Sequence, residues 1–108
     1  MSSAFIELNE TNFAEEVLGS PDPVLVHFWA GWSQPSKAMT PVLEAVNEDI
    51  SNPVRVGRVN LEQHEALAEQ YGVQCVPTVL IFNQGGLQDQ IVGRASEQEI
   101  REKLERFK

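Results

Sequence analysis

The sequence contains a single cysteine among its 108 residues, and this scarcity limits its redox chemistry. One cysteine cannot form a disulfide within the chain, so the cysteine count gives no sign of an oxidising compartment. The only two histidines are His27 and His64, with no cysteine pair or acidic cluster at metal-ligand spacing. We therefore expect no metal ion and no bound cofactor, and we expect His64 to be solvated.

Long apolar runs and basic residues are also scarce. No apolar run approaches the roughly 20 residues of a membrane-spanning helix, and the first thirty residues lack a basic segment followed by an apolar stretch and a cleavage site. We therefore expect a cytoplasmic protein that does not contact membranes. Sixteen acidic against eight basic residues give a formal charge of −8, which would repel a phosphate backbone. Nucleic acid is not an expected partner.

The residues that are present predict one α/β domain over residues 1–108, since this length and 42% hydrophobic content suffice for one core. Apolar patterns predict strands at residues 4–8, 24–30, 54–60, 78–82 and 87–92. They predict helices that end near residue 18, begin after residue 33, cover residues 62–71 and close the chain after residue 96. The order βαβαβαββα implies a mixed central sheet with helices on both faces.

Side-chain caps are expected at three helix starts. Asn12 with Glu15, and Ser96 with Glu99, have the spacing of capping boxes, and Ser33 stands where it can cap the long helix. The buried face of the long helix is expected to consist of Met39, Val42, Leu43, Val46 and Ile50. That of the last helix is expected to consist of Ile100, Leu104 and Phe107.

The most informative segment is residues 28–37, Phe-Trp-Ala-Gly-Trp-Ser-Gln-Pro-Ser-Lys. It resembles the F-W-A-x-W-C-G-P-C-K motif of the thioredoxin family, with Ser33 and Ser36 at both cysteine positions. Residues 71–78, Tyr-Gly-Val-Gln-Cys-Val-Pro-Thr, resemble the family's Y-G-[IV]-x-x-[IV]-P-T, and residues 92–93 its V-G loop. The resemblance covers nearly the whole chain. It implies a thioredoxin fold with a cis peptide bond before Pro77.

The resemblance also implies a thiol–disulfide oxidoreductase, but the residues of that reaction have changed. The reaction needs an attacking thiolate and a resolving thiol, and Ser33 and Ser36 supply neither. His27 and Arg58 match the family's buried Asp and Lys, so the carboxylate is missing as well, and a nearby cation disfavours a charged imidazole. We expect none of these four residues to be catalytic.

Two other interpretations of His27 remain. It could be a neutral, hydrogen-bonded core histidine, which we favour. It could instead be the base for a serine nucleophile, but the sequence shows neither a group to orient the imidazole nor an oxyanion hole.

The positions that line the family's partner groove are retained. By resemblance, the partner-binding residues are Trp32, Cys75, Val76, Pro77, Val92 and Gly93. An extended partner chain would pair with the backbone before Pro77, and Trp32 would add an apolar contact. Core packing is an equal alternative for Val76 and Val92. Arg94 stands where the family usually has a small residue, and it would make the rim more cationic and favour acidic peptides.

Three functions remain open. The first is a redox-inactive module that binds protein or extended peptide segments, either as a chaperone-like protein or as a subunit of a complex. The second is a monothiol redox protein acting through Cys75, although nothing flanking this residue would activate it and we expect an inert, partly buried thiol. The third is a scaffold that competes with an active thioredoxin for its partners.

Overall fold

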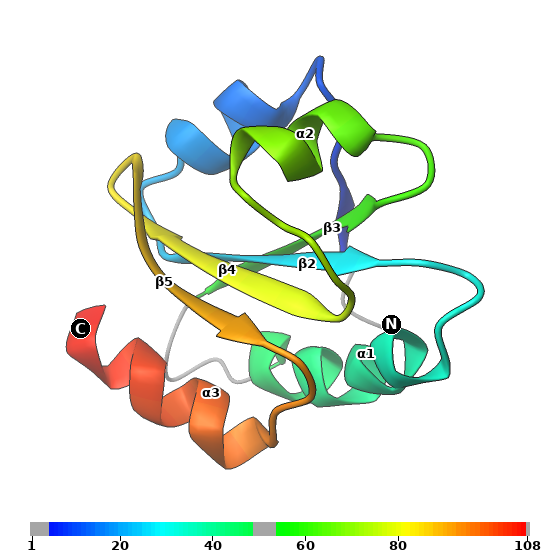
Figure 1. Cartoon of the computed structure of the whole chain (residues 1–108). Helices are drawn as coiled ribbons and strands as arrows, with labels where there is room; N and C mark the ends of the chain where they lie inside the picture. Colours follow the sequence, from blue (N-terminus) through cyan, green and yellow to red (C-terminus); the bar gives the residue numbers. More distant parts are fainter. Residues whose placement is uncertain (1–4, 49–53, 108) are drawn as a thin grey trace.

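A five-stranded sheet forms the centre of the computed structural model, which describes residues 5–48 and 54–107 (Figure 1). The strands are Ile6–Glu7 (β1), Val24–Trp29 (β2), Arg55–Asn60 (β3), Thr78–Asn83 (β4) and Gly86–Val92 (β5). Their order across the sheet is β1-β3-β2-β4-β5. The pairs β1–β3 and β3–β2 are parallel, whereas β2–β4 and β4–β5 are antiparallel. The predicted mixed sheet is confirmed.

Helices cover both faces of this sheet, as predicted. Helices α1 (Gln34–Asn47) and α3 (Glu97–Leu104) lie on one face, and η1 (Ala14–Leu18) and α2 (Glu65–Gln70) lie on the other (Figure 1). Helix α3 continues into a short 3-10 turn, Glu105–Phe107 (η2). Within the described ranges, no helix is both long and apolar enough to cross a membrane.

The core has two layers because successive side chains of a strand point to opposite faces of the sheet. In the layer under η1 and α2, the two central strands β2 and β4 contribute Val24, Val26, Phe28, Leu80 and Phe82. The layer under α1 and α3 takes Leu25, Val79 and Ile81 from the same strands. The alternation places His27, between Val26 and Phe28, on the α1 face.

The first helical segment differs from the predicted capping box. The N–H of Gly19 donates to the carbonyl of Ala14, five residues earlier, so η1 is a π-type turn. Asn12 does not cap it, because its Oδ1 accepts the N–H of Asn9 at 2.8 Å, and Asn9 Oδ1 in turn accepts the N–H of Asn12 at 3.0 Å. These local bonds replace the box expected between Asn12 and Glu15.

Helix α2 and strand β1 also differ from their predicted boundaries. Helix α2 begins at Glu65 instead of Glu62, because Asn60 Oδ1 accepts the Glu62 N–H at 2.9 Å and builds a turn first. Strand β1 covers only Ile6–Glu7 of the predicted residues 4–8. The expectations for Ala4, Ile50 and the side chain of Phe107 lie outside the described part of the chain.

The other two predicted caps are confirmed. Ser33 Oγ accepts the N–H of Ser36 at 3.2 Å. Ser96 Oγ accepts the N–H of Glu99 at 3.1 Å, while Glu99 Oε1 accepts the N–H of Ser96 at 2.9 Å. The second pair is a complete capping box, and it fixes the start of α3 where the chain leaves the sheet.

Replacing Ser96 should measure what this box contributes to stability. Ser96→Ala removes the cap, and we expect the free energy of unfolding to fall by about 1 kcal/mol in urea titrations. Glu99→Gln is the matched control, because glutamine can still accept the N–H of Ser96 and should cost much less. Equal losses in the two variants would contradict a role for the serine hydroxyl.

Candidate functional site

The two motif serines hold the turn between β2 and α1. Ser36 is fully buried, and its Oγ accepts the N–H of Ala30 at 3.2 Å. Its hydroxyl can donate to the carbonyl of Ser33 at 2.9 Å or of Ala30 at 3.1 Å. Ser33 is also buried and caps α1. Both hydroxyls therefore bind backbone, and neither bonds to His27 in the part of the chain that is described.

His27 lies on the α1 face of β2 and is only 1% exposed. Burial, and then the positive charge of Arg58, lower the pKa of His27 to about 4, although the backbone of Ser36 partly offsets them. His27 is therefore neutral at pH 7, as expected. The expected hydrogen bonds are absent, however: neither ring nitrogen has a well-oriented partner among the described residues, because position 27 faces an apolar layer. Among the described residues, His27 therefore does not act as a hydrogen-bonded base for the hydroxyl of Ser33 or Ser36.

Arg58 is the register partner of His27 across the β2–β3 pair. Its guanidinium carbon lies 4.2 Å from the centre of the Trp29 ring, and its Nε lies 3.4 Å from Glu7 Oε2. This ion pair lacks hydrogen-bond geometry at Nε. The Arg58 guanidinium therefore stacks on the Trp29 ring. Among the described residues, the site has no buried carboxylate that could exchange protons.

Of the predicted partner-binding residues, five lie where β4 begins and β5 ends, and Trp32 follows the end of β2. Thr78 pairs with Val92 across β4 and β5, and the N–H of Gly93 donates to the carbonyl of Pro77 at 2.9 Å. The segment before β4 therefore lies beside the segment after β5. Gly93 has a φ of 89°, which favours glycine at this point of the V-G loop. The peptide bond between Val76 and Pro77 is cis.

The exposure of these residues decides between contact and core packing. Trp32 is 68% exposed and Val92 is 59% exposed, so core packing is wrong for Val92. Val76 is half-buried and packs partly against the η1 layer, and Pro77 is buried. The backbone of Val76 makes no hydrogen bond to another described residue. The site thus combines exposed apolar side chains with an unpaired stretch of backbone.

Cys75 is exposed, which corrects the expectation of a partly buried thiol. The chain turns at this position, because the hydroxyl of Thr78 donates to the Cys75 carbonyl at 2.8 Å and so fixes the backbone before the strand. The Cys75 Sγ lies 4.0 Å from the same Thr78 oxygen. Sequence reasoning missed the role of Thr78, although a threonine three residues after a turn is a known signal for this kind of bond.

His64 is only partly solvated, because it also contacts a carboxylate. Its Nδ1 lies 2.8 Å from Glu10 Oε1, and 23% of its side chain is exposed. The pair joins the segment before η1 to the start of α2. Among the described residues, no group of three or more His, Cys, Asp or Glu side chains is placed to hold a metal ion.

The buried, neutral state of His27 predicts a pH dependence of stability. The pKa of His27 is 6.5 in the unfolded chain and about 4 in the folded protein, so between these pH values only the unfolded chain binds a proton at this residue. Stability should therefore fall as the pH falls through this window, by up to about 3 kcal/mol from this group. Denaturant titrations at several pH values should show a shallower loss in His27→Leu. The difference between the two proteins isolates His27 from carboxylates, and parallel pH profiles would contradict the assignment.

Comparison with known proteins agrees with this geometry. A family model described as Thioredoxin matches residues 4–106. The chain is similar to the thioredoxin of Buchnera aphidicola subsp. Acyrthosiphon pisum, at 40% identity over 100 residues that cover 93% of each chain. It is also similar to thioredoxin 1 of Nostoc sp., at 34% identity over 104 residues, 96% of this chain and 97% of the relative. With its mixed five-stranded sheet and its motif at the start of α1, the chain belongs to the thioredoxin family.

Proposed function

We propose that this protein is a redox-inactive member of its family that binds extended segments of other proteins, as a chaperone-like module or as a subunit of a complex. The observation that carries the proposal is the exposure of Trp32, 68% of which faces solvent immediately before Ser33. Large aromatic side chains dominate the energetics of protein interfaces. A cytoplasmic location remains part of the proposal.

The loss of chemistry is supported by the way the serines are used. A serine hydroxyl does not replace a thiolate in disulfide exchange. Ser36 is also buried and bound to the backbone of Ala30. His27 beneath it is neutral and offers no carboxylate. These residues support the structure of the turn and leave the surface above it free for binding.

The binding mode is supported by the backbone beside Trp32. An extended segment can pair with the N–H and carbonyl of Val76, as a strand adds to the edge of a sheet. Its side chains would then contact Trp32 on one side and Val92 on the other. Main-chain pairing gives affinity with little demand on the partner's sequence, and the exposed side chains add apolar contact.

The exposure of Cys75 favours a second candidate, a monothiol redox protein. The Cys75 thiolate would attack a partner disulfide, form a mixed disulfide and release one partner thiolate. A glutathione thiolate would then attack the partner's sulfur of the mixed disulfide, which releases Cys75 as a thiolate and joins the partner to glutathione. A second glutathione thiolate would attack the glutathione sulfur of that disulfide, so that the reduced partner and oxidised glutathione are the products. The third candidate, a scaffold that competes with an active thioredoxin for its partners, would use the same surface as the binding module.

Insulin reduction should distinguish binding from redox chemistry. We expect dithiothreitol to reduce insulin at the uncatalysed rate in the presence of the wild-type protein, because the chain has no thiol pair. The rate should be the same with Cys75→Ser. Catalysis that persists in Cys75→Ser would contradict the redox-inactive assignment. Catalysis that this substitution abolishes would support the monothiol candidate instead.

Substitution of Trp32 should identify the binding surface. Trp32→Ala should weaken binding of reduced, carboxymethylated α-lactalbumin by about 1–3 kcal/mol in calorimetric titrations, since it removes an interface aromatic. Stability should change little because the side chain is exposed. Leu87→Ala is the matched control, since Leu87 is also exposed but lies at the opposite end of β5 from Val92. Equal weakening in both variants would indicate unspecific apolar contact and overturn the assignment.

A further inference from the structure

Two cations of the described surface have no carboxylate partner. Of the eight lysines and arginines, Lys108 is not among the described residues. Five of the other seven form ion pairs: Arg55 with Glu16, Arg58 with Glu7, Arg101 with Glu97, and Lys103 and Arg106 with Asp89. Lys37 and Arg94 form no ion pair with a described carboxylate, and both are exposed. In a chain with a formal charge of −8, these two positions therefore keep a positive charge that no described carboxylate offsets through an ion pair.

Arg94 is held next to the proposed groove by its neighbours on both sides. Before it, the N–H of Gly93 donates to the carbonyl of Pro77 at 2.9 Å. After it, the N–H of Ala95 lies 3.5 Å from the buried Met39 Sδ in α1. The backbone of residue 94 is therefore fixed between the proline turn and α1, and the side chain starts two residues after the exposed Val92.

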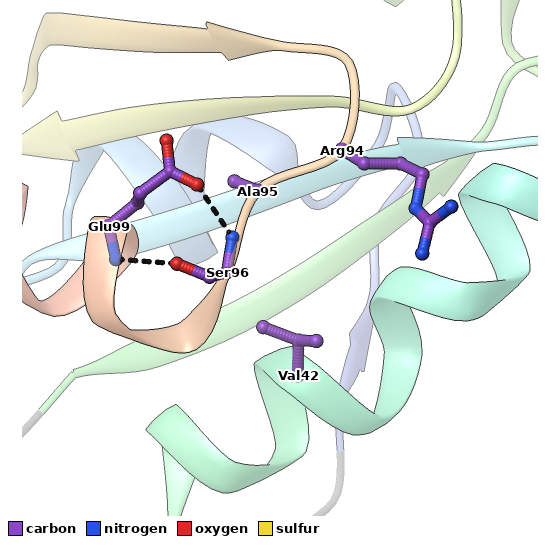
Figure 2. Close-up of a pocket in the computed structure, with 5 residues that line it drawn as sticks. All are labelled: Val42, Arg94, Ala95, Ser96 and Glu99. Carbon is purple, nitrogen blue, oxygen red and sulfur yellow. Dashed lines mark hydrogen bonds between the residues drawn. The ribbon is translucent and has the colours of Figure 1, made fainter.

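Arg94 shares a shallow depression with the carboxylate of Glu99, which already accepts a hydrogen bond. Val42, Arg94, Ala95, Ser96 and Glu99 line a shallow depression between α1 and α3. Figure 2 shows Glu99 turned towards Ser96 and the Arg94 guanidinium extending the other way, alongside α1. Glu99 Oε1 accepts the Ser96 N–H at 2.9 Å within the capping box. Among the residues that the structure describes, no carboxylate pairs with Arg94, so its guanidinium is available to a ligand.

We propose that Arg94 pairs with a carboxylate of the bound segment, so that the groove selects extended segments with Asp or Glu beside an apolar residue. This inference rests on the binding function proposed above. A guanidinium is planar and can hold a carboxylate through two parallel hydrogen bonds. The net negative charge of the protein opposes acidic partners at long range, but salt screens this repulsion beyond about 8 Å at physiological ionic strength. The contact pair is screened less, so selection is local.

Lys37 provides a matched control for the charge. It is exposed and unpaired like Arg94, and it lies in the first turn of α1. Val42 of α1 lines the same depression as Arg94. Lys37 precedes Val42 by five residues, which places the two side chains about 140° apart around the helix. Lys37→Gln therefore removes the same charge from a different flank of the helix.

The test uses capped peptides of alternating valine and serine that differ only at one central position, which is Glu, Gln or Lys. The wild-type protein should bind the Glu peptide about 3- to 5-fold more tightly than the Gln peptide, as for a partly exposed pair, and the Lys peptide least. Arg94→Gln should bind the Glu and Gln peptides equally. Arg94→Lys should keep part of the preference, and Lys37→Gln should keep all of it. Circular dichroism checks that each variant is folded.

Each other outcome overturns a defined claim. Equal binding of the Glu and Gln peptides by the wild type would overturn the selection by charge and leave the proposed binding function intact. A preference lost equally in Lys37→Gln and Arg94→Gln would show an effect of net charge and overturn the role of Arg94. Failure of all three peptides to bind would overturn both the inference and the proposed function.

Discussion

The antiparallel pairing of β2 with β4 is the constraint on which the site depends. It places the end of β2, where the chain continues to Trp32 and Ser33, beside the start of β4, where the chain leaves Pro77. The pairing of β4 with β5 then adds Val92 on the other side of Pro77. Three segments far apart in sequence therefore meet at one end of the sheet. The register of two ladders, and not any single contact, holds them in place.

The interior beneath this junction contains polar groups that the fold does not satisfy. In the described part of the chain, both ring nitrogens of His27, the indole N–H of Trp29 and the Nε of Arg58 are buried without a well-oriented partner. Unsatisfied buried polar atoms lower stability. The imidazole of His27 is neutral at pH 7 because burial and the charge of Arg58 lower its pKa, whereas the nearby surface presents the exposed indole of Trp32 and the unpaired backbone of Val76. These features are the ones on which the proposed binding function rests.

Motifs and strand periodicity could be read from the sequence because they depend on local chemistry. The pattern of apolar residues predicted the mixed sheet with helices on both faces, and Ser33 and Ser96 were correctly placed as caps. The capping box at Asn12 was wrong because Asn9 competes for the same backbone groups, and spacing alone cannot rank two such competitors. The start of α2 moved for a similar reason at Asn60.

The remaining features depend on contacts between distant segments. The exposure of Cys75 and the pairing of His64 with Glu10 require the folded geometry. The unpaired state of Arg94 also became apparent only from the structure, in which five of the other six described lysines and arginines form ion pairs. A sequence shows which charges are present, but the fold determines which of them remain unpaired.

Amide chemical-shift mapping should show where an extended segment binds. A capped peptide of alternating valine and serine with a central glutamate should be titrated into the protein labelled with nitrogen-15. Binding at the groove predicts the largest shifts at Trp32, Val76 and Val92, together with the indole N–H of Trp32. Shifts that cluster on the acidic face of α3, with Trp32 unaffected, would contradict the account.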